Sequence, residues 1–180
     1  MKKPLPASVH VRQVPFNKLS KAAQRVAIAQ DAIRQIKANK YYISTGRWVD
    51  VAVEASDAVE SGMPDIDQQA LLYGLPAVPR KITCTCCAVG AAFLSSIRLA
   101  DKAVIQGGAV ETLEEAADQL KRYFSQDQID LIEEAFEKGG GYCHTDKGDG
   151  VAFGRDYEDA TERALAIFKN IVKNKGEFKP

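Results

Sequence analysis

The most apolar stretch of the sequence is TCCAVGAAFLSSIRL, which runs from Thr85 to Leu99. Drawn as a helix, it carries apolar residues on nearly every side, and a helix that is apolar all round is normally buried at the centre of a domain. Small residues such as Ala88, Gly90 and Ala91 let neighbouring elements approach it closely. We therefore predict that residues 85–99 form the central helix of the fold.

Helical signals on both sides of this stretch predict the elements that cover it. Ser20 is a suitable N-cap for a helix that runs to about Asn39. Its apolar stripe consists of Val26, Ala29, Ile33 and Ile36. Three more helices are expected to begin near Thr112, Ser125 and Asp156, the first two with capping-box patterns.

A small amount of β-structure is expected between the first helix and the central one. β-branched or aromatic residues flank Thr45-Gly46-Arg47 over residues 41–53, which favours a β-hairpin. The sequence shows no internal repeat and no linker between domains. We therefore predict one domain over residues 1–180, with residues 1–6 mobile. The predicted fold class is mainly α (α+β), with about five helices around a buried central helix and a small β-hairpin.

Charge argues against several classes of partner. The 180 residues include 24 basic and 24 acidic side chains, so no net field attracts nucleic acid or an anionic membrane. The charges are nevertheless segregated, because residues 1–48 contain ten Lys or Arg and the single acid Asp31. No segment approaches the roughly 18 uninterrupted apolar residues of a membrane span, and no signal-peptide core follows Met1. These features predict a cytoplasmic protein that binds neither nucleic acid nor a membrane.

Three of the four cysteines lie within four positions, at the predicted start of the central helix. A helix N-terminus lowers the pKa of a thiol, and the thiolate is both a nucleophile and a metal ligand. One hypothesis is a catalytic pair of Cys84 or Cys86 with His144, as in Cys/His hydrolases. Another is a zinc site of Cys84, Cys87, Cys143 and His144, although the spacing is poor for zinc. The third interpretation, which the composition favours, is that these cysteines simply pack in the core as reduced thiols.

A glycine-rich segment near the end of the chain predicts a binding loop. Gly139, Gly140 and Gly141 lack the preceding strand and the following Lys-Ser/Thr of a phosphate loop, so helix termination is one role for them. With Lys147 and Arg155 close by in the sequence, the same loop could instead cradle a small anionic ligand such as a nucleotide. The ligand spacing argues against a calcium loop.

Three blocks of sequence carry a resemblance to other proteins. They are Arg25 to Asp31 with Lys40 to Ile43, Cys84 to Ala91, and Asn170 to Phe178. Together they resemble small accessory proteins encoded by bacteriophages and their bacterial hosts. The resemblance implies a protein of the host cell cytoplasm that binds a host factor or sequesters a signalling molecule, for example in counter-defence. It carries no activity and no catalytic residue with it.

The absence of a convincing catalytic set favours binding over catalysis. We expect stoichiometric binding of a host protein or of a small nucleotide-like ligand, by a monomer or a homo-oligomer, with no cofactor unless zinc is bound. Two alternatives stay open at this point. They are a hydrolase that uses a cysteine with His144, and a structural protein whose fold is stabilised by zinc.

Overall fold

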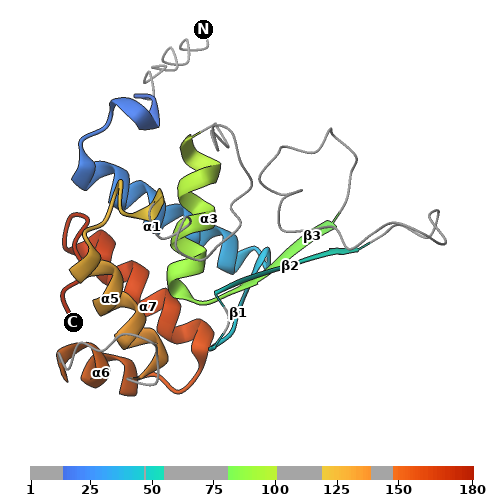
Figure 1. Cartoon of the computed structure of the whole chain (residues 1–180), viewed down its shortest axis with the longest axis vertical. Helices are drawn as coiled ribbons and strands as arrows, with labels where there is room; N and C mark the ends of the chain where they lie inside the picture. The colour runs from blue at the N-terminus through green and yellow to red at the C-terminus, as the bar shows by residue number, and fades with distance from the viewer. Residues whose placement is uncertain (1–13, 47, 55–80, 101–118, 139–147) are drawn as a thin grey trace, which may run out of the picture.

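The computed structural model describes residues 14–46, 48–54, 81–100, 119–138 and 148–180. Within them the fold is mainly α (α+β), as predicted, with five α-helices and three strands (Figure 1). The helices are α1 (Lys21–Lys37), α3 (Ala88–Ala100), α5 (Gln126–Glu137), α6 (Gly148–Arg155) and α7 (Ala160–Lys173). The strands are β1 (Tyr41–Ile43), β2 (Val49–Glu54) and β3 (Lys81–Cys86). Residues 1–6 and most of the helix predicted from Thr112 lie outside the described residues.

Helix α1 begins and ends close to where its sequence predicts. The side chain of Ser20 accepts a hydrogen bond from the backbone N–H of Ala23 at 3.2 Å, which caps the helix. Asn39 follows the last turn in the left-handed region, with φ of 53°. Of the predicted stripe, Ala29 and Ile36 are buried, whereas Val26 and Ile33 are only half-buried. Because α1 packs against both α3 and α7, its buried face also includes other residues, which are Gln24, Ile28, Asp31, Ala32 and Gln35.

The sheet differs from the predicted hairpin. Both predicted segments are strands, but they do not pair with each other, because β3 lies between them in the order β1-β3-β2. β1 pairs with β3 in parallel, with Tyr41 opposite Cys84, and β2 pairs with β3 antiparallel, with Val49 opposite Cys86. The turn at Gly46, with φ of +69°, carries the chain across the end of β3, so β1 and β2 run antiparallel to each other with β3 between them. β3 is distant from both strands in the sequence, so no local pattern predicts that it lies between β1 and β2.

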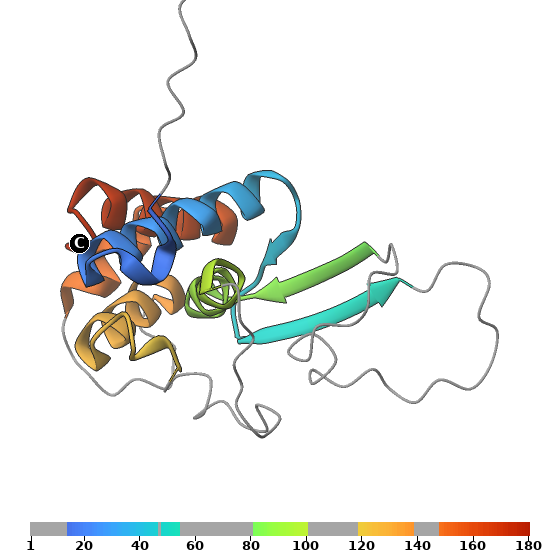
Figure 2. The same cartoon turned by 90° about the horizontal axis from the view of Figure 1, so that it is seen from above.

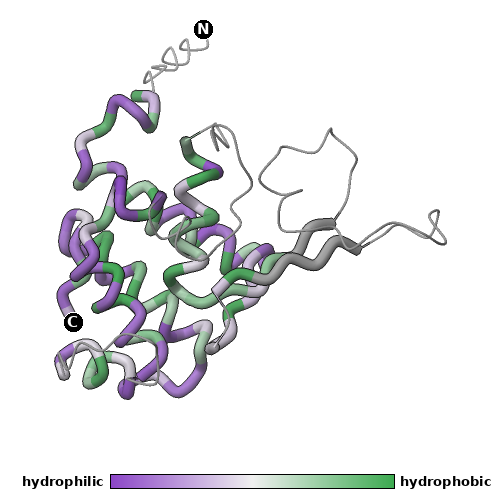
Figure 3. The backbone as a smooth tube through the Cα atoms, viewed as in Figure 1, coloured by the Kyte–Doolittle hydropathy of each residue, from purple (hydrophilic) through white to green (hydrophobic). Residues whose placement is uncertain are grey.

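Helix α3 is the central element, and Figure 2 shows it end-on between α1 and α5. In Figure 3 it is mainly apolar, whereas hydrophilic residues recur along α1. The helix begins three residues later than predicted, at Ala88, because the chain up to Cys86 is drawn into the sheet by pairing on both sides. A Cβ on Gly90 would lie 1.9 Å from the carbonyl oxygen of Trp48, so α3 contacts the chain before β2 closely enough to require glycine.

The last three helices pack around α5, which contacts both α6 and α7, and α7 also packs against α1. Ser125 caps α5 as predicted, with its side chain accepting from the N–H of Gln128 at 3.3 Å. Helix α6 was not predicted, since its sequence is rich in glycine. It packs against α5 at Gly154, where a Cβ would lie 2.0 Å from the carbonyl oxygen of Ala135. The final helix begins at Ala160, four residues later than expected, with Asp159 as its N-cap.

Aromatic side chains fill the core between these helices. Phe124, Phe136, Phe168 and Phe178 are each at most 1 % exposed. Phe178 belongs to the tail after α7, which is fastened by Gln128: the side-chain amide donates to the carbonyl oxygen of Phe178 at 3.1 Å and accepts from its N–H at 2.6 Å. The tail is thus part of the folded core. In the part of the chain described here, every helix is too short or too polar to cross a membrane.

Candidate functional site

The cysteine cluster lies in the core, divided between a strand and a helix start. Cys84 and Cys86 belong to β3, and Cys87 lies between β3 and α3. Their exposed fractions are 6 %, 0 % and 5 %, and all three are free thiols. Cys87 occupies the position before the helix, where its sulfur accepts from the N–H of Gly90 at 3.4 Å. The packing interpretation of these cysteines therefore agrees with their positions.

Burial reverses the expected effect on thiol acidity. Burial raises the pKa of Cys87 to about 12, although hydrogen bonds from the N–H groups of Gly90 and Val89 act in the opposite direction. Burial also raises the pKa values of Cys84 and Cys86, and the neighbouring thiols add to the rise at Cys86. The prediction that the helix N-terminus lowers these pKa values is therefore wrong. All three groups are neutral thiols near pH 7, which are poor nucleophiles and poor ligands.

The residues predicted to act together with the cysteines lie outside the described part of the chain. Cys143 and His144 fall outside the described residues, as do Gly139 to Gly141 and Lys147. Among the described residues no group of three or more Cys, His, Asp or Glu is placed to hold a metal ion. The catalytic pair and the zinc site remain predictions. Arg155 is exposed at the end of α6, and it does not line the groove described next.

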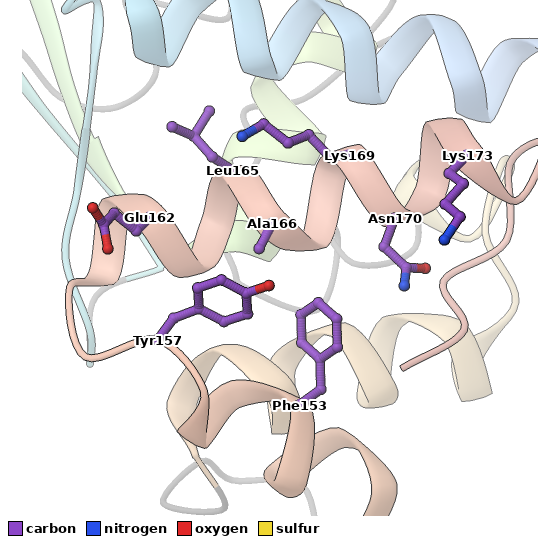
Figure 4. Close-up of a pocket in the computed structure, with 8 residues that line it drawn as sticks. All are labelled: Phe153, Tyr157, Glu162, Leu165, Ala166, Lys169, Asn170 and Lys173. Carbon is purple, nitrogen blue, oxygen red and sulfur yellow. The ribbon is translucent and has the colours of Figure 1, made fainter.

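A groove of about 580 Å³ runs between α6 and α7 and is the candidate binding site. Figure 4 shows two rings, Phe153 and Tyr157, beneath α7, with Glu162 toward one end of that helix and Lys173 toward the other. The remaining lining residues are Leu165, Ala166, Lys169 and Asn170. Those from α7 recur every three or four positions, so they share one face of the helix. The groove therefore has a ring-lined floor and ends of opposite charge.

Packing holds the two rings in place. Phe153 contacts Phe178 edge-on at 5.1 Å between ring centroids, and lies 5.5 Å from Tyr157. The close contact of Gly154 with Ala135 of α5 fixes the position of the neighbouring Phe153 relative to the core. Aromatic pairs at these distances and angles are favourable beyond their buried area. The rings are thus supported from below by the core.

The turn between the two helices is fastened by a buried arginine. Arg163, 3 % exposed, donates to the carbonyl oxygens of Tyr157 at 3.0 Å and Glu158 at 2.9 Å, and also to that of Phe136 in α5. The side chain of Asp159 accepts from the N–H of Glu162 at 2.8 Å. A guanidinium that bonds three carbonyl oxygens fixes the turn rigidly. The groove is consequently preformed, which lowers the entropic cost of binding.

The lysines of the groove are available to a ligand. Lys169 and Lys173 are exposed, and neither forms an ion pair with a described residue. They are four residues apart and start from neighbouring positions on the helix. In Figure 4 the Lys169 side chain extends toward Leu165, whereas Lys173 lies nearer the other end of α7. Asn170, between them, is already engaged, because its side chain donates to the carbonyl oxygen of Lys179 and accepts from the N–H of that residue. The two ammonium groups are therefore polar groups of the groove that can bind an anion.

A second polar cluster, which the sequence did not reveal as a site, joins α1 to α3. The carboxylate of Asp31, with 0 % side-chain exposure, accepts two hydrogen bonds from Arg98, at 3.0 and 2.7 Å. It also accepts from Arg34, and from the side-chain amide of Gln35 at 3.2 Å. The only hint in the sequence was a single acid in a basic block, three residues before Arg34 and four before Gln35. Arg98 could not be foreseen, because it is 67 positions away.

Hydrogen bonding keeps Asp31 ionised in spite of burial. Burial raises the pKa of this carboxyl, but the bonds from Arg98, Arg34 and Gln35 together outweigh it and lower the pKa to about 2. The same bonds raise the pKa of Arg98. Next to this cluster, the hydroxyl groups of Ser95 and Tyr41 lie 3.5 Å apart. The cluster is therefore a charged group of two cations and one anion at a helix crossing.

Comparison of the chain with protein-family models, with curated proteins and with solved structures found no match to any of them.

Proposed function

We propose that the protein is a stoichiometric binding protein for a small, ring-containing anion, a nucleotide-like ligand, which it holds in the groove between α6 and α7. The observation that carries the proposal is that Lys169 and Lys173, which form no ion pair with a described residue, line the same groove as two supported rings, Phe153 and Tyr157. A ligand that combines a negative charge with a flat ring satisfies both features at once.

The volume of the groove and the positions of its charged residues along α7 support this class of ligand. A volume of about 580 Å³ lies within the range of pockets that hold small molecules, roughly 300–1,000 Å³. Glu162 and Lys169 are seven residues apart, which is about 10 Å along a helix. This span suits a nucleoside monophosphate, with N–H or O–H donors toward Glu162 and the phosphate toward the lysines. Base stacking on aromatic side chains contributes roughly 1–3 kcal/mol per base.

Binding without turnover is the expected activity. The described thiols are buried and neutral, and the groove itself contains no nucleophile paired with a base. This fits the sequence-based expectation that the protein sequesters a ligand. Sequestration of a signalling nucleotide would serve counter-defence.

The test uses adenosine 5′-monophosphate as the probe and adenosine as its uncharged counterpart. Isothermal titration calorimetry should show binding of the monophosphate near one equivalent, and clearly weaker binding of adenosine. Replacing both lysines, Lys169→Gln with Lys173→Gln, should weaken monophosphate binding about tenfold, since each exposed charge contributes roughly 0.5–1 kcal/mol. The matched control is Lys18→Gln with Lys37→Gln, which removes two exposed lysines outside the groove.

Three outcomes would contradict the proposal. They are no binding of the monophosphate, equal binding of adenosine and its monophosphate, and an unchanged affinity in the groove variant. Conversion of the probe by substoichiometric protein would show an enzyme instead. Removal of one ring, in Tyr157→Ala, should weaken binding of both adenosine and its monophosphate.

A further inference from the structure

We propose that Arg34 and Arg98, held side by side by the buried carboxylate of Asp31, form a second binding site that takes a phosphate group. This site lies at the crossing of α1 and α3 and uses no residue of the groove. The proposal of this second site can therefore be tested independently of the function proposed above.

The first argument is geometric. Nη2 of Arg34 and Nη2 of Arg98 both donate to Oδ1 of Asp31. Two donors on one acceptor atom cannot be farther apart than two hydrogen-bond lengths, roughly 6 Å. The two guanidinium groups are therefore close enough to share one polyatomic anion.

The second argument is an account of donors. A guanidinium has five N–H groups. Arg98 uses Nε and Nη2 on Asp31, which leaves Nη1 available, and Arg34 uses only Nη2. Neither side chain makes another hydrogen bond to a described residue, and their exposed fractions are 48 % and 63 %. The unused donors are thus accessible from solvent.

The third argument concerns charge. Two guanidinium groups and one carboxylate leave an excess of one positive charge on neighbouring side chains. One guanidinium is enough to neutralise the buried carboxylate of Asp31, so charge balance alone does not explain why the cluster holds two. It does orient two planar forks, and arginine forks match phosphate oxygens in a bidentate manner. A phosphate group, with three acceptor oxygens and up to two negative charges, fits this arrangement better than a carboxylate does.

The source of the phosphate can be free phosphate or a phosphate ester, and the experiment separates the two. The probes are inorganic phosphate, O-phosphoserine and acetate, each added at constant ionic strength to the full-length ¹⁵N-labelled protein. The readout is the chemical shift of the arginine Nε–Hε signals, followed to saturation. Inorganic phosphate should shift the signals of Arg34 and Arg98 and leave Arg122, which is exposed elsewhere, unchanged. An equal or larger effect of phosphoserine identifies an ester as the natural source, whereas an effect of inorganic phosphate alone identifies the free ion.

Two variants test the roles of the side chains. Arg34→Gln leaves Arg98 to neutralise Asp31, so the fold should survive while phosphate affinity falls about tenfold. Arg98→Lys keeps the charge but removes the fork, and should weaken binding similarly. Arg122→Lys is the matched control and should bind as the wild type does.

The proposal is overturned if phosphate shifts Arg122 as much as Arg34 and Arg98, if acetate binds as well as phosphate, or if Arg34→Gln binds with unchanged affinity. The double groove variant, Lys169→Gln with Lys173→Gln, separates the two sites. It should retain the phosphate-dependent shifts of Arg34 and Arg98. Loss of these shifts in that variant would assign the phosphate to the groove and refute the arginine site.

Discussion

Replacement of Asp31 by asparagine should destabilise the protein in a way that depends on pH. The side chain is fully buried, and it accepts charge-assisted hydrogen bonds from Arg34 and Arg98. Asparagine preserves the size of the side chain and removes its charge. The variant Asp31→Asn therefore measures what the charge contributes.

The magnitude follows from the pKa. These hydrogen bonds outweigh the effect of burial and lower the pKa of Asp31 from 3.8 to about 2. At about 1.4 kcal/mol per pKa unit, the ionised form contributes about 2 kcal/mol to the free energy of unfolding. Loss of one partner of a fully buried pair costs roughly 3–5 kcal/mol. A smaller value is expected here because both arginines are about half exposed and can be rehydrated.

The sign of the pH dependence follows from the direction of the shift. A carboxyl whose pKa is lower in the folded state stabilises the fold fully above its unfolded pKa, here near pH 4. The contribution is lost as the pH falls from about 4 to about 2. The difference in unfolding free energy between wild type and Asp31→Asn should thus be about 2 kcal/mol at pH 7 and shrink below pH 4.

Urea unfolding followed by circular dichroism at pH 7, 5, 4 and 3 provides the measurement. Other carboxyl groups titrate equally in both proteins, so they cancel in the difference. The control is Asp156→Asn, at an exposed position, which should change stability little. A difference that does not vary with pH, or one below about 0.5 kcal/mol at pH 7, would refute the reasoning.

Three further predictions concern the core. Gly90→Ala should lower the free energy of unfolding, measured in urea, by several kcal/mol, because its Cβ would lie 1.9 Å from the carbonyl oxygen of Trp48. The control Gly148→Ala, with nothing within 4 Å of its Cβ, should be tolerated. Equal effects of the two substitutions would contradict the close contact. In a Cys143→Ser background, the three buried thiols should react with a disulfide reagent at least about 100-fold more slowly in the native protein than in denaturant, because burial raises their pKa values. Rapid labelling of the native protein would contradict both the burial and the raised pKa values. Phe178→Ala should lower the unfolding free energy by about 3–5 kcal/mol, and Lys179→Ala by much less. A mild effect of Phe178→Ala would contradict the inference that the tail belongs to the core.

Helix caps were predictable because they depend on residues within one turn. Ser20 and Ser125 cap α1 and α5 at the predicted positions, since each side chain reaches an N–H three residues ahead. Helix α6 was missed for the opposite reason. Its three glycines weaken its own helical preference, and its packing on α5, at Gly154 against Ala135, depends on contacts that no local pattern records.

The candidate sites were less predictable than the fold. The ligand site predicted from the glycine-rich loop, Lys147 and Arg155 lies mostly outside the described residues, and the groove contains none of its residues. No sequence motif marked the rings and lysines of the groove. The periodicity of α7 marks which residues share a face, yet it does not show that Tyr157 lies opposite that face. The turn held by Arg163 brings them together.

Local sequence alone defined a helical domain of mixed charge whose most apolar stretch is central, because hydrophobic periodicity and capping act over a few residues. The tertiary structure decided the rest. It drew Cys84 and Cys86 into a strand, separated the expected hairpin by inserting β3, and joined Asp31 to Arg98 across 67 positions. Strand pairing and buried charge pairs gain their free energy from partners distant in the chain, so only the folded chain reveals which partners meet.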